Sequence, residues 1–519
     1  MTKTIKFLLD GEELNAHPNE TIWQVAKRKG IDIPHLCYTE SAGYRPDGNC
    51  RVCMVEIEGE RVLAASCIRK PSEGMVVYSS NKRAESSRKM VMELLISDQP
   101  PQNESHDPNS ELWSWAEKME QTESRFEPRR QTPCPDSSHT AMSVNLDACI
   151  HCTRCVRACR EVQVNDVIGM AGRGARNEIV FDFADPMGDS SCVACGECIQ
   201  ACPTGALMPA NEVGKIEPDT QIDSVCPYCG VGCQIRYNIK DNKILWVDGR
   251  EGIANSGRLC VKGRFGFDYA NHPERLNTPL IRREDAPPKH RDIQIDPSNP
   301  FTHFREASWE EALDIAANGL IKIRDTNGAN ALAGFGSAKG SNEEAYLFQK
   351  LIRTGFGTNN VDHCTRLCHA SSVAALLECI GSGAVTASFN EAENADVIII
   401  IGAQPTTNHP VAATFMKNAV KRGAKLIVLD PRGSALSRHA THFLQFKPGT
   451  DVALLNAIMH VIVEEELCDN KYIQAHTEGF EKMRLHLANY NPEIMSDICG
   501  IDSDLIKEVA RLYAKSTAG

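Results

Sequence analysis

Cysteine dominates the chemistry that this sequence could carry. The chain has 519 residues and 22 cysteines, and most of the cysteines fall into four sets of four. The sets are Cys37, Cys50, Cys53 and Cys67; Cys149, Cys152, Cys155 and Cys159; Cys192, Cys195, Cys198 and Cys202; and Cys226, Cys229, Cys233 and Cys260. Four thiolates form the ligand set of an iron–sulfur cluster, which carries single electrons. The sequence therefore predicts a file of one-electron centres.

The two middle sets have the spacing CxxCxxCxxxC, and the second is followed directly by Pro203. In such a pair, three thiolates of each run bind one [4Fe–4S] cluster and the fourth binds the neighbouring cluster. The predicted ligands of one cluster are Cys149, Cys152, Cys155 and Cys202. The predicted ligands of the other are Cys192, Cys195, Cys198 and Cys159.

The first set contains a single CxxC pair, with twelve residues before it and thirteen after it. We expect a [2Fe–2S] cluster; the alternative is a zinc site, although zinc loops usually contain two such pairs. The spacing resembles the N-terminal [2Fe–2S] domain of the NADH dehydrogenase large subunit, of iron hydrogenases and of some formate dehydrogenases. Those families next carry a [4Fe–4S] loop of one histidine and three cysteines. This chain has no cysteine between Cys67 and Cys134, so we expect that cluster to be lost and Cys134 to be a free thiol.

The fourth set has the spacing CxxCxxxC, followed by the distant Cys260 and then by Lys262. It resembles the first domain of the molybdopterin oxidoreductases, the dimethyl sulfoxide reductase superfamily, in which a [4Fe–4S] cluster lies against a pterin. The resemblance implies that Lys262 lies between the cluster and the pterin. Without the motif, Lys262 would be interpreted as a surface lysine.

The segment Asp362–Ser371 contains the dipeptide Cys368-His369. It resembles the metal loop of formate dehydrogenase catalytic subunits, which implies that Cys368 binds molybdenum or tungsten and that His369 acts beside it. A soft thiolate suits a high-valent metal, and an imidazole can accept the proton released from formate. Nitrate-reducing relatives lack the adjacent histidine, so the pair favours formate. Taken alone, the dipeptide would be a buried thiol beside an ordinary histidine. The cysteines expected to be apolar core thiols are Cys364, Cys379, Cys468 and Cys499.

Strands and helices must position these groups. Near the N-terminus, an apolar strand at residues 5–9, the turn Asp10-Gly11, and a helix capped by Asn19 and ending at Gly30 predict a β-grasp unit. After residue 300, apolar strands at 396–401 and 425–430 alternate with helices. Short strands of this kind are buried on both faces, which predicts a doubly wound parallel sheet.

Two helices of this region begin at predicted capping boxes, Ser308–Glu311 and Ser341–Glu344. The first should bury one apolar face, and a strand is expected at 331–336. The face consists of Ala312, Ile315, Ala316, Leu320 and Ile323.

Ligands of parallel sheets bind at the carboxyl ends of the strands. Glycine lets the backbone approach a pyrophosphate, and an acidic residue after a strand can bind ribose hydroxyls. The segments at these ends resemble the guanine-dinucleotide-binding segments of formate dehydrogenase catalytic subunits. The residues predicted to bind the cofactor are Lys262, Gly402, Gln404, Thr407, His409, Asp430, Arg432, Gly449 and Asp451.

The predicted fold class is a multidomain chain of α+β and α/β type. The expected domains are a [2Fe–2S] ferredoxin-type β-grasp domain at 1–80, a linker with the degenerate His-Cys cluster region at 81–145, a two-cluster ferredoxin domain at 146–212, a molybdopterin oxidoreductase [4Fe–4S] domain at 220–276, and an incomplete molybdopterin-binding α/β domain at 277–519. Formate dehydrogenases of this family continue well beyond this length. A fragment, a chain completed by another subunit, and a truncated homologue are the three explanations left open.

The resemblance implies oxidation of formate to carbon dioxide at a molybdenum or tungsten centre held by two molybdopterin guanine dinucleotides. Electrons would leave through three [4Fe–4S] clusters and one [2Fe–2S] cluster to an acceptor subunit. That acceptor could be a flavin subunit reducing NAD, a quinone-linked partner or a ferredoxin, and further copies of the chain are also left open as partners. The alternative is a non-catalytic electron-transfer subunit like the NADH dehydrogenase large subunit, against which Cys368 and His369 argue. An iron hydrogenase would need further cysteine motifs.

Charge and hydropathy exclude some partners. The net charge of −12 argues against nucleic acid. The longest apolar run, Val397–Ile401, has the length of a strand, so membrane contact is expected only through a partner. The opening residues lack the apolar core of a signal peptide and a twin arginine. We therefore expect a cytoplasmic chain, in which cysteines are metal ligands more often than disulfides.

Overall fold

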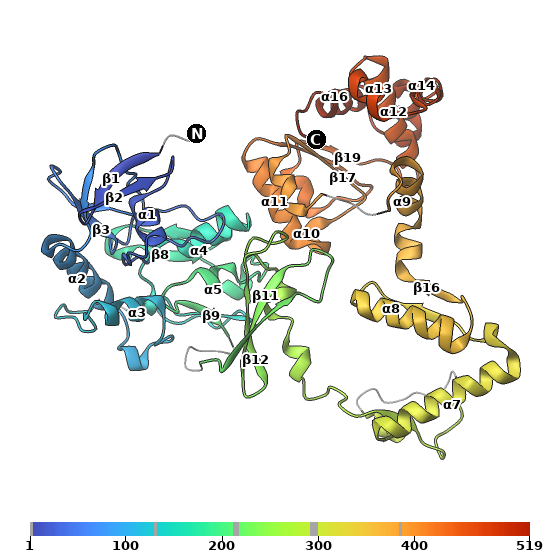
Figure 1. Cartoon of the computed structure of the whole chain (residues 1–519), viewed down its shortest axis with the longest axis horizontal. Coiled ribbons are helices and arrows are strands. Elements are labelled where there is room, and N and C mark those ends of the chain that lie inside the picture. The colour runs from blue at the N-terminus through green and yellow to red at the C-terminus, as the bar shows by residue number, and fades with distance from the viewer. Residues whose placement is uncertain (1–3, 129–131, 211–216, 291–298, 384–386) are drawn as a thin grey trace. The chain divides into compact units, whose positions relative to one another are not determined.

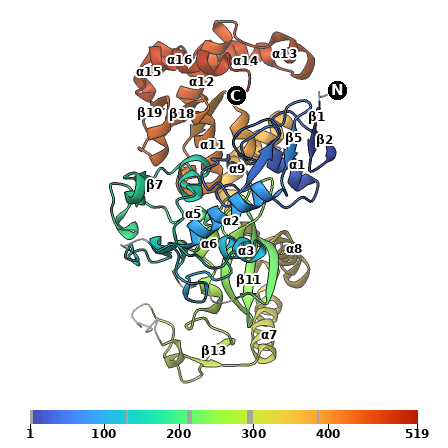
Figure 2. The same cartoon turned by 90° about the vertical axis from the view of Figure 1, so that its left-hand side faces the viewer.

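The computed structural model describes residues 4–128, 132–210, 217–290, 299–383 and 387–519. The chain divides into two compact units, Met1–Phe267 together with Ser388–Gly519, and Asp268–Ala387. Figures 1 and 2 show the elements of both units in two views, and each unit is described by itself below.

The first unit opens with a five-stranded sheet in the order β2-β1-β5-β3-β4 and the helix α1, which together form the predicted β-grasp unit. Asp10 and Gly11 both have positive φ angles and turn β1 into β2, as expected. Helix α1 is capped by Thr21 rather than by Asn19. The Thr21 hydroxyl accepts from Gln24 N, and the Gln24 side chain accepts from Thr21 N, so both exposed donors are satisfied. The elements are β1 (Ile5–Leu9), β2 (Glu12–Ala16), α1 (Ile22–Arg28), β3 (Met54–Ile57), β4 (Ala64–Ala65) and β5 (Val76–Tyr78).

Two helices follow the sheet, α2 (Lys82–Ile96) and α3 (Glu111–Lys118). They cover the loops of the first cysteine set, because Met92, Leu112 and Trp113 pack in one buried cluster with Cys37 and Cys50. Cys152, from the second cysteine set, belongs to the same buried cluster.

The ferredoxin-like region contains two similar loops. Each loop leads into a short helix, and the residues before those helices have matching left-handed φ angles, 62° at Thr153 and 68° at Gly196. A similar match occurs two residues earlier, at His151 and Ala194. The two CxxCxxC runs therefore have the same local geometry. The elements are β6 (Met142–Val144), α4 (Arg154–Arg157), a π-helix (Ala158–Val162), β7 (Ile168–Ala171), β8 (Glu178–Phe181), α5 (Glu197–Ala201) and β9 (Leu207–Pro209).

A three-stranded antiparallel sheet and a short helix carry the fourth cysteine set. The loop of residues 226–233 connects β10 (Thr220–Val225) to β11 (Gln234–Lys240). Strand β12 (Lys243–Gly249) completes the sheet, and Cys260 precedes α6 (Val261–Phe265).

The predicted parallel sheet is present, with the order β17-β18-β19. Alternate residues face opposite sides: Ile427 and Leu429 pack with α12, α15 and α16, whereas Leu426 and Val428 pack with residues of α11. Helices thus cover both faces, as a doubly wound arrangement requires. The elements are β17 (Val397–Ile401), α10 (Pro405–Asn408), α11 (Pro410–Lys421), β18 (Lys425–Leu429), β19 (His442–Leu444), α12 (Asp451–Glu464), α13 (Asn470–His476), α14 (Phe480–Leu487), α15 (Pro492–Cys499) and α16 (Ser503–Ala514).

Within its described residues, the second unit contains three α-helices and two small sheets. Strands β15 and β16 pair in parallel, and β13 and β14 pair antiparallel. The expected strand at 331–336 is shorter than predicted and begins at Gly334. The elements are β13 (Leu280–Arg282), β14 (Phe304–Glu306), α7 (Trp309–Asn327), β15 (Gly334–Gly336), α8 (Asn342–Lys350), β16 (Val361–His363) and α9 (Cys364–Ile380).

Two expectations for the second unit need correction. Ser341 and Glu344 form the predicted capping box of α8, but α7 has only half of one. Its Ser308 caps Glu311 N, while the Glu311 carboxylate pairs with Arg305 instead. The apolar face expected to be buried on α7 is exposed or only partly buried among the residues that the structure describes.

No helix within the described part of the chain is both long enough and apolar enough to cross a membrane.

Candidate metal centres

The four cysteines of the first set lie together and are all buried. The Cys37 thiol is hydrogen-bonded to the thiols of Cys50 and Cys67, and the Cys53 thiol is hydrogen-bonded to that of Cys67. These hydrogen bonds lower the pKa of Cys37 and Cys53 and raise the pKa of Cys50 and Cys67. The residues present therefore fit a group bound by four thiolates, as a [2Fe–2S] cluster is.

The second and third sets exchange one cysteine each. Cys202 lies with the first three cysteines of the second set, and all four line one small apolar cavity. Burial, together with the nearby charges of Cys202 and Cys149, raises the pKa of Cys152 to about 12. The four cysteines around this cavity are Cys149, Cys152, Cys155 and Cys202.

The exchange is reciprocal. Burial raises the pKa of Cys198, and the charges of Cys195, Cys192 and Cys159 add to the increase. Backbone N–H groups point at sulfur in both sets, since His151 N donates to Cys149 Sγ at 3.4 Å and Ala194 N donates to Cys192 Sγ at 3.3 Å. Hydrogen bonds of this kind to ligand sulfurs are a feature of iron–sulfur sites.

The fourth set gathers at the end of the β10–β12 sheet. Burial raises the pKa of Cys233, and the charges of Cys226, Cys229 and Cys260 raise it further. Lys262 lies in the first turn of α6 and is exposed. Among the described residues, no three His, Cys, Asp or Glu side chains converge on the position of a single metal ion.

Arginines connect the first set to the second. The Arg157 guanidinium is 1% exposed and donates to the carbonyl oxygens of Cys37 and of Cys152, the latter at 3.2 Å. Arg154 donates to Leu36 O at 3.3 Å and forms an ion pair with Glu111 at 2.7 Å. The loop of the first set therefore lies directly on the helix of the second.

A buried polar network connects the third set to the fourth. Arg264 of α6 donates to Cys195 O at 3.4 Å and to Gln200 Oε1 at 2.7 Å. Gln163 donates to Leu259 O at 3.1 Å and to the buried Glu197 carboxylate at 3.3 Å. Burial raises the pKa of Glu197. The four cysteine sets are thus in successive contact, in the order first, second, third, fourth.

The predicted cofactor residues of the parallel sheet follow strands that end at one edge. In the sheet register, Ile401 pairs with Leu429 and Leu429 pairs with Leu444. Gly402 follows β17 with a φ angle of +58°, and the buried Asp430 follows β18. Gln404 precedes α10, Thr407 lies in α10, and His409 precedes α11. Arg432 N donates to the Asp430 carboxylate at 2.7 Å. Gly449 lies just before α12, and Asp451 is the first residue of that helix.

Cys368 and His369 lie on α9 of the second unit, and Cys368 is exposed. They therefore belong to a different unit from Lys262 and the sheet edge. The His363 side chain caps α9 by accepting from Thr365 N at 3.0 Å. The expectation of buried thiols holds for Cys499 but is wrong for Cys364 and Cys379, which are exposed because α9 buries no residue among those described.

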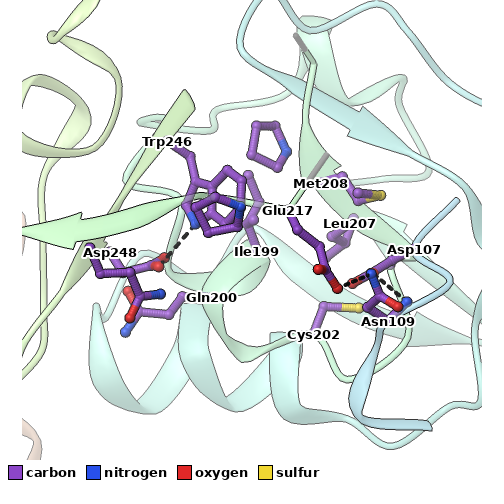
Figure 3. A pocket seen from close by; sticks show the side chains of 14 residues that line it. Asp107, Asn109, Ile199, Gln200, Cys202, Leu207, Met208, Glu217, Trp246 and Asp248 are labelled. Atoms are coloured by element: carbon purple, nitrogen blue, oxygen red, sulfur yellow. Dashed lines mark hydrogen bonds between the residues drawn. The ribbon is translucent and has the colours of Figure 1, made fainter. Parts of the chain in front are cut away.

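A cavity of about 710 Å³ lies beside Cys202 and was not signalled by any sequence motif. Figure 3 shows Trp246 and Asp248 on one wall, joined by a hydrogen bond of 3.0 Å, and Asn109 with Glu217 on another. Sequence reasoning also missed Arg157, because its partners are backbone carbonyls.

Four known protein families match successive parts of the chain. Residues 275–494 match the family described as Molybdopterin oxidoreductase, and residues 219–272 match the Molybdopterin oxidoreductase Fe4S4 domain. Residues 2–82 match the 2Fe-2S iron-sulfur cluster binding domain. Residues 140–208 match the ferredoxin-like domain of NADH-quinone oxidoreductase subunit 3.

Curated relatives match along nearly all of the chain. A Bacillus subtilis (strain 168) protein named "Probable oxidoreductase YjgC" is 30% identical over 553 residues, which cover 98% of this chain and 54% of the relative. A Staphylococcus haemolyticus (strain JCSC1435) protein named "Putative formate dehydrogenase SH0748" is 29% identical over 557 residues, with the same coverage. The chain thus spans about half the length of the curated relatives it matches.

Among solved structures, acetylene hydratase from Pelobacter acetylenicus aligns with a TM-score of 0.48 and 23% identity, over 57% of this chain and 39% of that one. The family matches, which follow one another along the sequence, show that the chain carries 2Fe-2S and ferredoxin-like domains ahead of a molybdopterin oxidoreductase Fe4S4 domain and a molybdopterin oxidoreductase domain.

Proposed function

We propose that the chain takes part in oxidising formate to carbon dioxide and in passing the electrons on, one at a time, to a partner. Formate gives carbon dioxide, one proton and two electrons. The observation that carries the relay is the successive contact of the four cysteine sets, through Arg157, the exchanged cysteines and Arg264. Formate as the substrate is supported by the Cys368-His369 pair and by the relatives named as formate dehydrogenases.

The proposed ligands of one [2Fe–2S] and three [4Fe–4S] clusters are the sixteen cysteines of the four sets. Cys368 is the proposed ligand of a molybdenum or tungsten centre with two molybdopterin guanine dinucleotides. When bound, these groups supply a two-electron acceptor for formate and one-electron carriers beyond it. Gly402, Asp430 and their neighbours at the sheet edge are proposed to hold the dinucleotide, with Lys262 near the pterin.

The chain's own residues have distinct proposed tasks. His369 accepts the proton that formate releases, since an imidazole nitrogen can act as a general base. Arg157 and Arg264 hold successive cysteine loops against one another. The partner that receives the electrons is proposed to be a flavin subunit reducing NAD, a quinone-linked subunit or a ferredoxin.

Elemental analysis with pterin extraction tests the proposal on the purified protein. Iron together with molybdenum or tungsten and an extractable pterin guanine dinucleotide is the expected result. Iron alone, without either metal or a pterin, would instead favour a non-catalytic electron-transfer subunit.

Cys368→Ser tests the assignment of the metal ligand. The variant should lose formate oxidation with a viologen acceptor and keep its iron content and cluster spectra. Cys379→Ser, another exposed cysteine on α9, serves as the matched control and should retain activity. Activity that persists in Cys368→Ser contradicts the assignment.

A further inference from the structure

A buried lysine connects α11 to the loop that follows Cys159, the last cysteine of the second set. Lys417 is only 7% exposed. Its Nζ donates to Gln163 O at 2.8 Å, to Val164 O at 3.0 Å and to Asn165 Oδ1 at 3.1 Å. These residues directly follow the π-helix Ala158–Val162, which carries Cys159.

Two further side chains of α11 donate hydrogen bonds to carbonyl oxygens of this π-helix. Asn418 donates to Val162 O at 3.2 Å, and Lys421 donates to Arg160 O. The last carbonyls of a helix have no partner within the helix and carry a partial negative charge. Neutral donors such as Asn418 satisfy such carbonyls, so hydrogen bonding alone does not require a buried ammonium group at position 417.

A buried ammonium is costly unless a negative charge lies nearby. Around Lys417, the charged side chains are mostly positive: Arg438 opposes its charge, and Asp166 is already paired with Arg160 at 3.3 Å. The neighbouring His439 adds no negative charge, and burial lowers its pKa. Cys195 and Cys159 each favour the charged form of Lys417 more strongly than Asp166 does.

The path from the ammonium to that set is short. Asn165 accepts from Lys417 through Oδ1 and points its Nδ2 at Cys195 Sγ, 4.0 Å away. With the amide between them, Nζ and Sγ are at most about 10 Å apart. Val167 N also donates to Cys159 Sγ at 3.3 Å, so the same loop contacts two cysteines of the set.

We propose that Lys417 is a positioning residue whose positive charge raises the reduction potential of the [4Fe–4S] cluster held by Cys159, Cys192, Cys195 and Cys198. Reduction adds one electron and therefore one negative charge to the cluster, and the ammonium stabilises that charge. The inference rests on the cluster part of the proposed function and not on formate as the substrate. Burial lowers the pKa of Lys417 to about 8, so the group is charged at neutral pH.

A redox titration of the purified holoprotein, followed by electron paramagnetic resonance with dithionite as the electron donor, tests this proposal. Lys417→Gln keeps a donor for the carbonyls and removes the charge. We expect the equilibrium constant for reducing this cluster to fall about tenfold, which is a shift of about 59 mV to lower potential. The loss of the same signal in Cys159→Ser identifies the cluster.

Two variants complete the design. Lys417→Arg keeps the charge and should retain the wild-type potential. Lys421→Met removes an exposed lysine from the same helix, where solvent screens the charge, and should also leave the potential unchanged. The remaining clusters serve as internal references.

An unchanged potential in Lys417→Gln, with full iron content, would overturn the proposal. A loss of iron in both Lys417→Gln and Lys417→Arg would also overturn it, because the lysine would then be needed for packing and not for its charge. The titration uses no formate, so its result stands whether or not the protein oxidises formate.

Discussion

Arg157 gives the sharpest test of how the relay is held together. Its guanidinium lies between two cysteine loops and is 1% exposed. It donates to the carbonyl oxygens of Arg45, Cys37 and Cys152, and its Nε lies 3.2 Å from Asp47 Oδ2. Arg157→Met keeps most of the side-chain volume and removes every one of these interactions. We expect the first cysteine loop to separate more readily from the second.

The free-energy cost of Arg157→Met can be estimated from these contacts. Each buried acceptor that loses its partner costs about 1–3 kcal/mol, and breaking a buried ion pair costs about 3–5 kcal/mol. Asp47 keeps a second partner in Arg45, so the ion-pair loss is partial. A total of about 3 kcal/mol is therefore expected, because Cys152 O also keeps the Thr153 hydroxyl as a donor. At 1.4 kcal/mol for each tenfold change, the equilibrium for opening this contact should shift about a hundredfold.

Amide hydrogen exchange measures that opening directly. Amides of residues 36–38 and 150–153 should exchange about a hundredfold faster in Arg157→Met, in line with the estimate above. The β1–β2 amides should keep their wild-type rates. Arg51→Met, which removes an exposed arginine from the first cysteine loop, is the matched control. Equal exchange rates in Arg157→Met and wild type, at equal iron content, would refute the reasoning.

Two further predictions follow from the same contacts. Cys202→Ser and Cys149→Ser should abolish the same cluster signal, and Cys159→Ser and Cys192→Ser should both abolish the other, because the two runs exchange one ligand each. If Cys202→Ser instead abolished the same signal as Cys192→Ser, the exchange would be contradicted. The reduction potential of the cluster that includes Cys159 should fall as the pH rises above about 8, because Lys417 then loses the proton whose charge favours reduction. In redox titrations at a series of pH values, Lys417→Arg should show no such fall.

Cysteine spacing predicted the local part of these sites because the ligands of one loop are close in sequence. The exchange of Cys159 and Cys202 joins cysteines that are distant in sequence, and it was predictable because it is a property of paired runs. The residue that caps α1 was predicted less accurately than the cysteine sets. Asn19 is a good cap residue, but Thr21 with Gln24 satisfies two donors at once, and that reciprocal pair decides where α1 begins.

The residues that connect the loops could not be predicted. Arg157 contacts a carbonyl 120 positions earlier, and Lys417 contacts one 254 positions earlier. Every residue has a backbone carbonyl, so a sequence pattern cannot show which one a distant side chain contacts. The predicted burial of α7 was wrong for a different reason. Its apolar residues have helical spacing, but spacing does not show whether another part of the protein covers them.

The contacts also bear on the predicted loss of the His-Cys cluster between residues 98 and 106. If that cluster were a necessary step between the first and second cysteine sets, its loss would interrupt the relay. Arg157 instead places Cys37 O and Cys152 O on one guanidinium, so the two loops meet without any residue of that stretch between them. His106 is engaged elsewhere, with its Nε2 3.0 Å from the Asp147 carboxylate. On the proposed relay, an electron would therefore pass directly between the first and second cysteine sets, without a cluster held by residues 98–106.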